Sequence, residues 1–170
     1  MTDGDMGGAL WRFALEVYRK PGVADACLLL QDRHGCNVPL LLFAAWAGAE
    51  RGILLTADEV ATASSVVGAW HGEVVEVLRA VRRRLKHGPP PAPDAVTGDL
   101  RARLQAIEIE AERIELETLA RCLPERRGMI GPATTAANLA LAGLALAALP
   151  AEDSESSNAL QTIVEAALSP

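Results

Sequence analysis

The chain has 170 residues, of which 50% are hydrophobic and 22% charged, a composition that excludes a disordered chain and suits one domain with a core. The formal net charge of -6 disfavours nucleic acid as a partner. Three cysteines without a CxxC pair (Cys27, Cys36 and Cys122) and a polar start over residues 1–8 without a signal-peptide pattern predict a cytoplasmic protein.

The composition and the spacing of apolar residues predict an all-α protein, a single compact bundle of about six helices. We expect residues 1–8 to form a disordered tail and residues 9–149 to form the helical domain. Residues 150–170 are expected to form a polar linker and a short C-terminal helix. The segment 133–149 is almost uncharged but shorter than a membrane span needs, so we expect a buried helix and no membrane contact.

The first three helices are expected over residues 9–20, 23–33 and 38–51. Gly35 stands where a left-handed C-terminal cap would end the second helix, and Asn37 is suited to cap the third. The second and third helices are apolar on nearly all sides, which predicts that they lie at the centre of the bundle.

A fourth helix is expected from a capping box at 56–59 to about His87, with a weak point near Gly68 or Gly72. The proline-rich segment 88–93 then forms a stiff connector to the fifth helix. That helix should run over 99–123, with an apolar seam of heptad spacing made by Leu100, Leu104, Ile107, Ala111, Ile114 and Thr118.

The sixth helix is expected over residues 132–149, and a last short helix over 158–168. Small residues recur along the sixth helix at Ala136, Ala140 and Gly143, so another helix can approach it closely. We therefore expect a homodimer through the 132–149 helix.

Polar residues interrupt the apolar sequence at the turn between the second and third helices. Gln31, Asp32 and Asn37 either cap backbone groups there or face a small polar pocket. Cys27 and Cys36 with His34 lack a fourth ligand at the usual spacing, so no metal site is predicted.

A basic stripe on the fourth helix matches an acidic stripe on the fifth. If the proline connector folds these helices into an antiparallel hairpin centred near Pro93, Arg79 lies level with Ile107 and beside Glu108. The stripes then either form an ion-pair lattice or bind an anion such as phosphate. Their members are Arg79, Arg82, Arg83 and Lys86 on one helix and Glu108, Glu112 and Glu115 on the other.

Catalytic and cofactor signatures are weak. Glu108 and Glu112 lie one helical turn apart, as in helical di-metal sites, but no histidine follows a glutamate by three residues. Neither a nucleophile triad nor a nucleotide-binding glycine pattern occurs, so we predict no catalytic residue and no cofactor.

Three ordered motifs between Leu10 and Leu123 resemble a family of uncharacterised bacterial proteins known only as a domain of unknown function. They are Leu-Trp-x-Phe-Ala-Leu from Leu10 with Leu-Gln-Asp-x-x-Gly-x-Asn-Val from Leu30, then Trp70 with Leu78-Arg79 and Arg82-Arg83, and Glu-x-Glu-x-Glu-Arg from Glu108. The resemblance implies a small cytoplasmic helical protein and transfers no activity. It draws attention to the same polar side chains, which we expect to meet in a partly buried network between the second, fourth and fifth helices: Gln31, Asp32, Asn37, Arg79, Glu108 and Glu112.

These observations predict a cytoplasmic, non-enzymatic binding or adaptor protein with a partly buried polar network. Its partner would be another protein or a small anionic ligand. The alternative is a small enzyme or anionic-metabolite binder that uses Asp32, Glu108 and Glu112 with Arg79. The candidate binding residues are Gln31, Asp32, Asn37, Trp70, Arg79, Arg82, Arg83, Glu108 and Glu112.

Overall fold

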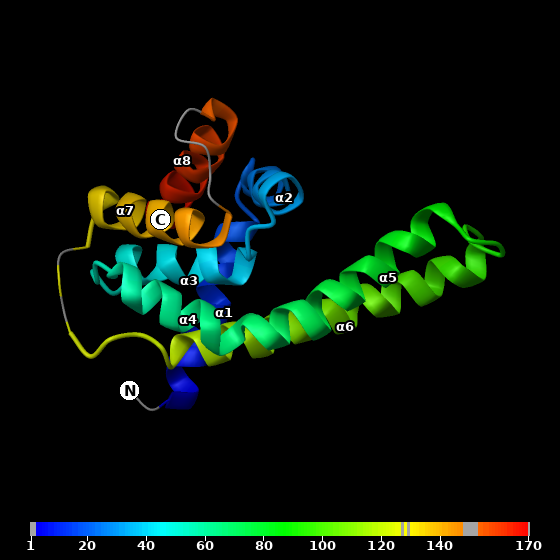
Figure 1. The fold of residues 1–170 in the computed structure, drawn as a ribbon, viewed down its shortest axis with the longest axis horizontal. Helices are drawn as coiled ribbons and strands as arrows, with labels where there is room; N and C mark the ends of the chain where they lie inside the picture. Colours follow the sequence, from blue (N-terminus) through cyan, green and yellow to red (C-terminus); the bar gives the residue numbers. More distant parts are fainter. Residues whose placement is uncertain (1–2, 127, 129, 148–152, 170) are drawn as a thin grey trace. The chain divides into compact units, whose positions relative to one another are not determined.

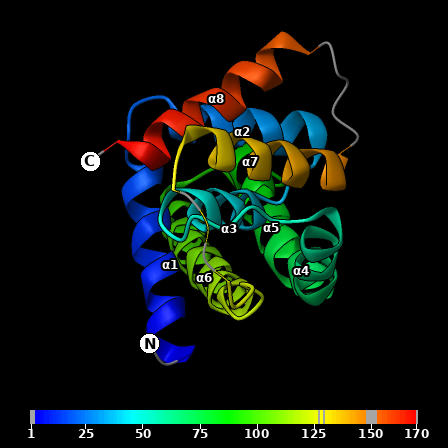
Figure 2. The same cartoon turned by 90° about the vertical axis from the view of Figure 1, so that its left-hand side faces the viewer.

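A computed structural model describes residues 3–126, 128, 130–147 and 153–169, and the regular structure in these ranges is helical without a strand (Figures 1 and 2). The all-α prediction is therefore confirmed. The dominance of alanine and leucine explains it, because these residues lose little conformational freedom in a helix.

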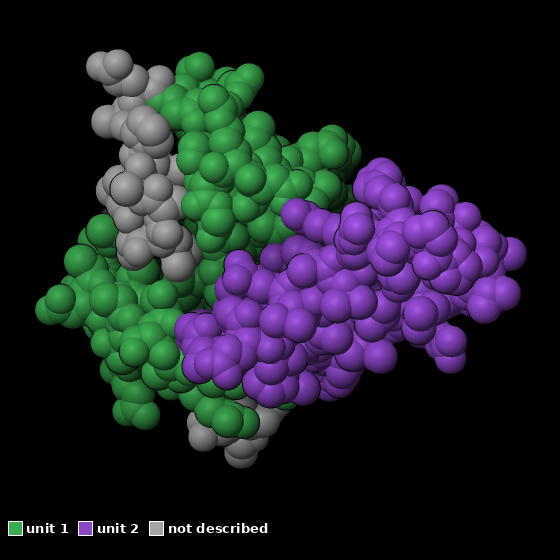
Figure 3. All heavy atoms as spheres, turned by 45° about the vertical axis from the view of Figure 1, so that its right-hand side comes forward, with its two compact units in different colours: residues 1–66, 116–170 green, residues 67–115 purple. Residues whose placement is uncertain are grey.

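The chain divides into two compact units rather than the single bundle that we expected (Figure 3). Unit 1 comprises residues 1–66 and 116–170, and unit 2 comprises residues 67–115. Two helices run from one unit into the other: α4 (Ala57–Trp70) and α6 (Ala95–Ala120). Unit 2 includes the hairpin that we predicted around Pro93. Apolar periodicity alone does not reveal that this hairpin forms a separate compact unit.

Unit 1 is built around α3 (Val38–Ala49), all twelve residues of which are buried. Asn37 caps this helix as predicted, because its side-chain oxygen accepts a hydrogen bond of 2.9 Å from the Leu40 amide. Four helices of the same unit contact α3: α1 (Asp3–Tyr18), α2 (Val23–His34), α7 (Pro132–Ala147) and α8 (Ser154–Leu168). Of these, α8 also lies against α2.

The two ends of the chain are more ordered than the sequence suggested. The first helix begins at Asp3, so it includes most of the segment that we expected to be a disordered tail. The last helix begins at Ser154 instead of residue 158, because the Asp153 side chain caps it by accepting a hydrogen bond from the Glu155 amide. It packs on α2 and α7, so it belongs to the helical core of unit 1 and is not an appendage.

The small residues of α7 accommodate α3 of the same chain. A Cβ atom added to Gly48 would lie 2.6 Å from the Thr135 Cα, so the two helix backbones nearly touch there. The predicted homodimer through residues 132–149 stays a prediction, and positions 148 and 149 lie outside the described residues. No helix in the described ranges combines the length and apolar character that crossing a membrane requires.

Asn138 of α7 ties the chain segment after α3 to the core. Its side chain is fully buried, and its amide nitrogen donates to the backbone oxygens of Ala44 and Ile53 at 3.2 and 2.7 Å. Its oxygen accepts from the Leu55 amide at 2.8 Å. A buried amide with all of these groups satisfied fixes a loop that would otherwise leave backbone groups unpaired.

Two glycine substitutions are expected to have opposite effects on the free energy of unfolding. Gly48→Ala should destabilise the protein by about 1–3 kcal/mol, because the new methyl group forces α3 and α7 apart. Gly68→Ala, in an exposed part of α4 with nothing within 4 Å of the added carbon, should stabilise it by about 0.5–1 kcal/mol. Urea unfolding of both variants measures the difference, and equal effects would contradict the assigned close approach.

Candidate functional site

Unit 2 is a helical hairpin. After α4, the chain continues through a π-helical segment η1 (His71–Val75) into α5 (Glu76–His87), and it returns along α6 after the non-helical residues 88–94 (Figure 1). The break that we expected near Gly68 or Gly72 is the π-helical segment, which contains Gly72. Glycine lowers the stability of a regular helix and makes such a deviation easier.

The hairpin holds an ion-pair network of four residues, Arg79, Arg82, Glu108 and Glu112, which we call the Arg79 network. The Arg79 Nε donates to Glu108 Oε1 at 3.0 Å, as the hairpin geometry predicted, and a terminal nitrogen of Arg79 donates to Glu112 Oε1 at 2.6 Å. Arg82 donates through Nε to Glu108 Oε2 at 2.5 Å and through a terminal nitrogen to Glu108 Oε1 at 3.1 Å. One carboxylate therefore joins two guanidinium groups, and one guanidinium joins two carboxylates.

Because these side chains are largely buried, the pKa of each carboxylate depends on the neighbouring charges of the network. The side chains of Arg79 and Glu108 are only 8% and 6% exposed. Burial alone would raise the pKa of Glu108, but hydrogen bonds and charge from Arg82 and Arg79 outweigh it and hold the pKa below its usual value. Burial raises the pKa of Glu112, with the neighbouring carboxylates of Glu108 and Glu115 adding to the effect against the opposing pull of Arg79.

Two further contacts cross the hairpin, and only one of them involves a residue that the sequence singled out as a candidate. The Trp70 indole nitrogen donates to the backbone oxygen of Ala111 at 3.0 Å. His71 Nδ1 lies 3.0 Å from Glu115 Oε2, and Glu115 is almost completely buried. The charge of Glu115 on the acidic stripe was visible in the sequence, but nothing there indicated His71 as its partner.

Aliphatic side chains lie on the opposite side of the same hairpin. Helical spacing places Val77 and Val81 of α5 about half a turn from Arg79, and it places Leu100, Ile107 and Ile114 of α6 together on one stripe. These five side chains, which we call the apolar face, are 40–54% exposed. The hairpin therefore buries the charged side chains of Arg79 and Glu108 while it leaves these five aliphatic side chains exposed.

The other candidate residues have different surroundings. Gln31 donates to Asp32 at 3.2 Å in unit 1, where Asp32 is exposed, and Asn37 acts as the cap of α3. We expected these three residues to share one network with Arg79, and since they belong to unit 1 that expectation stays a prediction. Arg83 is an exposed residue of α5.

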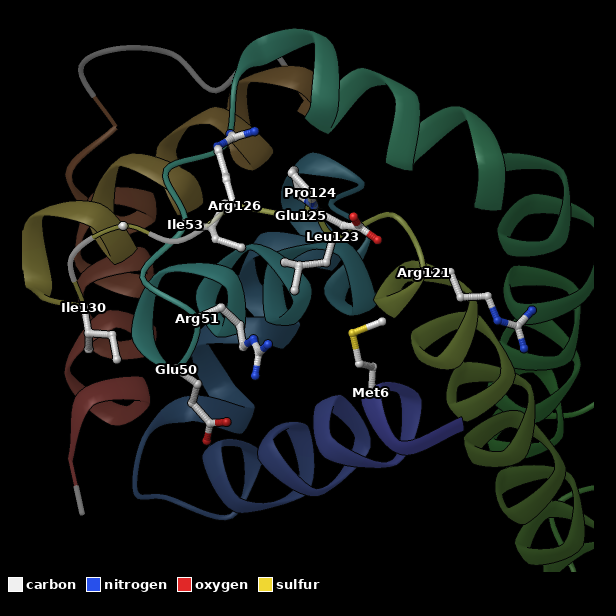
Figure 4. A pocket seen from close by; sticks show the side chains of 11 residues that line it. Met6, Glu50, Arg51, Ile53, Arg121, Leu123, Pro124, Glu125, Arg126 and Ile130 are labelled. Carbon is white, nitrogen blue, oxygen red and sulfur yellow. The ribbon is translucent and has the colours of Figure 1, made fainter. Parts of the chain in front are cut away.

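A hollow of about 780 Å³ lies in unit 1 (Figure 4). Met6 and Leu123 line its middle, while Glu50 and Arg51 stand on one side and Arg121 on the other. Both signs of charge occur around it, and Arg126 at its edge is already paired with Glu59 through two hydrogen bonds. The hollow therefore has no uniform charge that would select one class of ligand.

The residues that could have bound a metal are engaged elsewhere or remain protonated. His34 Nε2 lies 3.1 Å from Asp153 Oδ2 and 2.7 Å from Ser156 Oγ, at the start of α8. Burial raises the pKa of Cys36 to about 11, which keeps its thiol protonated and a poor ligand. Across the described ranges, no group of three or more His, Cys, Asp and Glu side chains is arranged to hold a metal ion.

The fold and the hairpin define a helical protein with a charged internal network. A family model described as "Protein of unknown function (DUF2390)" matches residues 9–119, and the chain belongs to this family. The match includes the whole hairpin and confirms the resemblance seen in the sequence to a domain of unknown function. Neither a curated protein nor a solved structure matches the chain.

A double-mutant cycle will measure how strongly the hairpin depends on its network. Arg79→Ala should cost about 3–5 kcal/mol of unfolding free energy, because it removes a buried guanidinium that is hydrogen-bonded to both Glu108 and Glu112. The coupling energy between Arg79→Ala and Glu112→Ala should exceed about 1 kcal/mol. The exposed pair Arg113 and Glu110, with charged atoms 4.0 Å apart, is the matched control and should couple by less than about 0.5 kcal/mol. Equal coupling in the two cycles would show that the network contributes no more than a surface ion pair.

The stability contributed by Glu108 should depend on pH. Its pKa is lower in the folded chain than the value of about 4.3 in an unfolded one, so its contribution is present above that value and is lost as the pH falls through the folded-state pKa. The difference in unfolding free energy between wild type and Glu108→Gln should therefore be largest near pH 7 and shrink below about pH 4. Urea unfolding across this range tests the sign, and a difference that grows towards acid would contradict it.

Proposed function

We propose that this chain is a cytoplasmic, non-enzymatic binding or adaptor protein, and that the hairpin of unit 2 is its binding element. The observation that supports this proposal is the combination of two features in unit 2. Four charged side chains pair with one another in the Arg79 network, while five aliphatic side chains of the apolar face are exposed to solvent.

The chemistry of the apolar face suits a helical protein segment. Two helices side by side present rows of aliphatic side chains at helical spacing, and an amphipathic helix buries matching residues against such rows. Burying each half-exposed aliphatic side chain adds about 1 kcal/mol of hydrophobic stabilisation. The rigid ion pairs beneath hold the two rows at a fixed spacing, which lowers the entropy cost of binding.

An enzymatic or anion-binding role has less support. Arg79, the guanidinium that such a role would need, already carries two carboxylates, so an incoming anion would have to displace one of them. Within the Arg79 network, the raised pKa of Glu112 favours acid–base chemistry. A protein-binding role requires no rearrangement of the network.

Photo-crosslinking in cells tests the proposal with two isoleucines of one helix. Ile107 belongs to the apolar face and is 54% exposed, whereas Ile109 is 43% exposed and points away from that face by helical spacing. A photoreactive phenylalanine analogue at position 107 should give discrete crosslinked proteins that the same group at position 109 does not give. No adduct at position 107, or the same adducts from both positions, would overturn the proposed binding element.

A further inference from the structure

We infer that the apolar face binds a second copy of this chain, with α5 lying antiparallel to α5 of the partner and α6 antiparallel to α6. This inference rests on the proposed binding role of the hairpin and names its occupant. It concerns a different surface from the 132–149 helix.

The first support is the order of residues along η1 and α5. Glu73, Val77, Val81 and Arg84 recur every three or four residues and line one side of the helix, and all four are exposed. An acidic residue stands at one end of this series, a basic residue at the other, and two valines between them. When such a series runs antiparallel to itself, each glutamate meets the partner's arginine and each Val77 meets a Val81.

The second support comes independently from α6. The exposed aliphatic residues of α6 are also symmetric: Leu100 and Ile114 lie seven residues on either side of Ile107. A twofold axis at position 107 would therefore place Leu100 against the partner's Ile114. Symmetric spacing of this kind is what an isologous interface needs, because the same surface must complement itself.

The two centres of symmetry lie at the same level of the hairpin. The valines of α5 are centred on Arg79, and Arg79 is bonded to Glu108, the residue next to the α6 centre at Ile107. One twofold axis through the apolar face therefore satisfies both helices together. The Arg79 network lies at that level and fixes the register between the two helices.

Charge selects this arrangement over the other twofold packing. If α5 lay on the partner's α6 at the same level, Arg84 would come beside Arg103 of the partner copy, and like charges would repel. In the antiparallel arrangement of α5 on α5, opposite charges meet twice, once at each end.

Sedimentation equilibrium of the purified full chain, from low to several hundred micromolar, tests the inference. The wild type should form a dimer. Val81→Ser should weaken it at least about tenfold, since two copies of the valine lie beside the axis. Ile109→Ser, the matched exposed residue outside the apolar face, should leave the dimer unchanged. A wild type that stays monomeric, or a dimer that tolerates Val81→Ser, would overturn the inference.

A charge exchange tests the orientation. Glu73→Arg and Arg84→Glu should each weaken the dimer about threefold to tenfold, and the variant that carries both should recover the wild-type affinity. Mixing the two single variants should give a heterodimer stronger than either homodimer. Failure of both the double variant and the mixture to recover affinity would overturn the antiparallel arrangement. Circular dichroism of each variant controls for folding.

The two experiments separate the inference from the function on which it rests. If the purified chain is monomeric while position 107 crosslinks to a different protein, the second copy is excluded and the binding element stands. If the purified chain is monomeric and position 107 gives no adduct, both proposals are overturned.

Discussion

The guanidinium of Arg79, shared between two carboxylates on the facing helix, is the interaction on which unit 2 depends. A buried charge destabilises the fold unless it is paired and hydrogen-bonded. The helices α5 and α6 are therefore favoured in the one register that brings Arg79 to Glu108 and Glu112. An aliphatic seam would have tolerated sliding of one helix along the other, because contacts between leucines and valines have little directional preference. The network thus trades some stability for a defined geometry.

That geometry accounts for the distribution of residue types over the hairpin. With the four charged side chains of the Arg79 network paired between the helices, the aliphatic residues of the apolar face remain on the outside. Exposure of such an aliphatic surface to water is energetically unfavourable, and surfaces of this kind are typical of sites where proteins associate. Unit 1 has the opposite pattern: α3 is buried along its whole length, and the polar group of Asn138 inside it serves the backbone.

Much of this could be read from the sequence, and the failures have physical causes. Apolar periodicity located the helices, and counting outward from the proline connector placed Arg79 beside Glu108. The caps at Gly35 and Asn37 were also recognisable, because few residue types satisfy those backbone positions. The pairing of His71 with Glu115 was not, since it depends on the turn geometry of η1 and on the packing of α6, neither of which leaves a local pattern. The division into two units was missed for the same reason: periodicity shows which side of a helix is apolar and not which neighbour it meets.

The π-helical segment η1 determines the direction in which the side chains of α5 point from the helix axis. One additional residue in a turn rotates all later side chains by roughly 100° relative to an uninterrupted α-helix. Without that rotation at His71–Val75, Arg79 would be carried away from the side on which it meets Glu108, and the valines would turn with it. A one-residue deletion in this segment would therefore rotate the charged and aliphatic groups of α5 together by roughly 100°, away from their present neighbours, without altering any side chain.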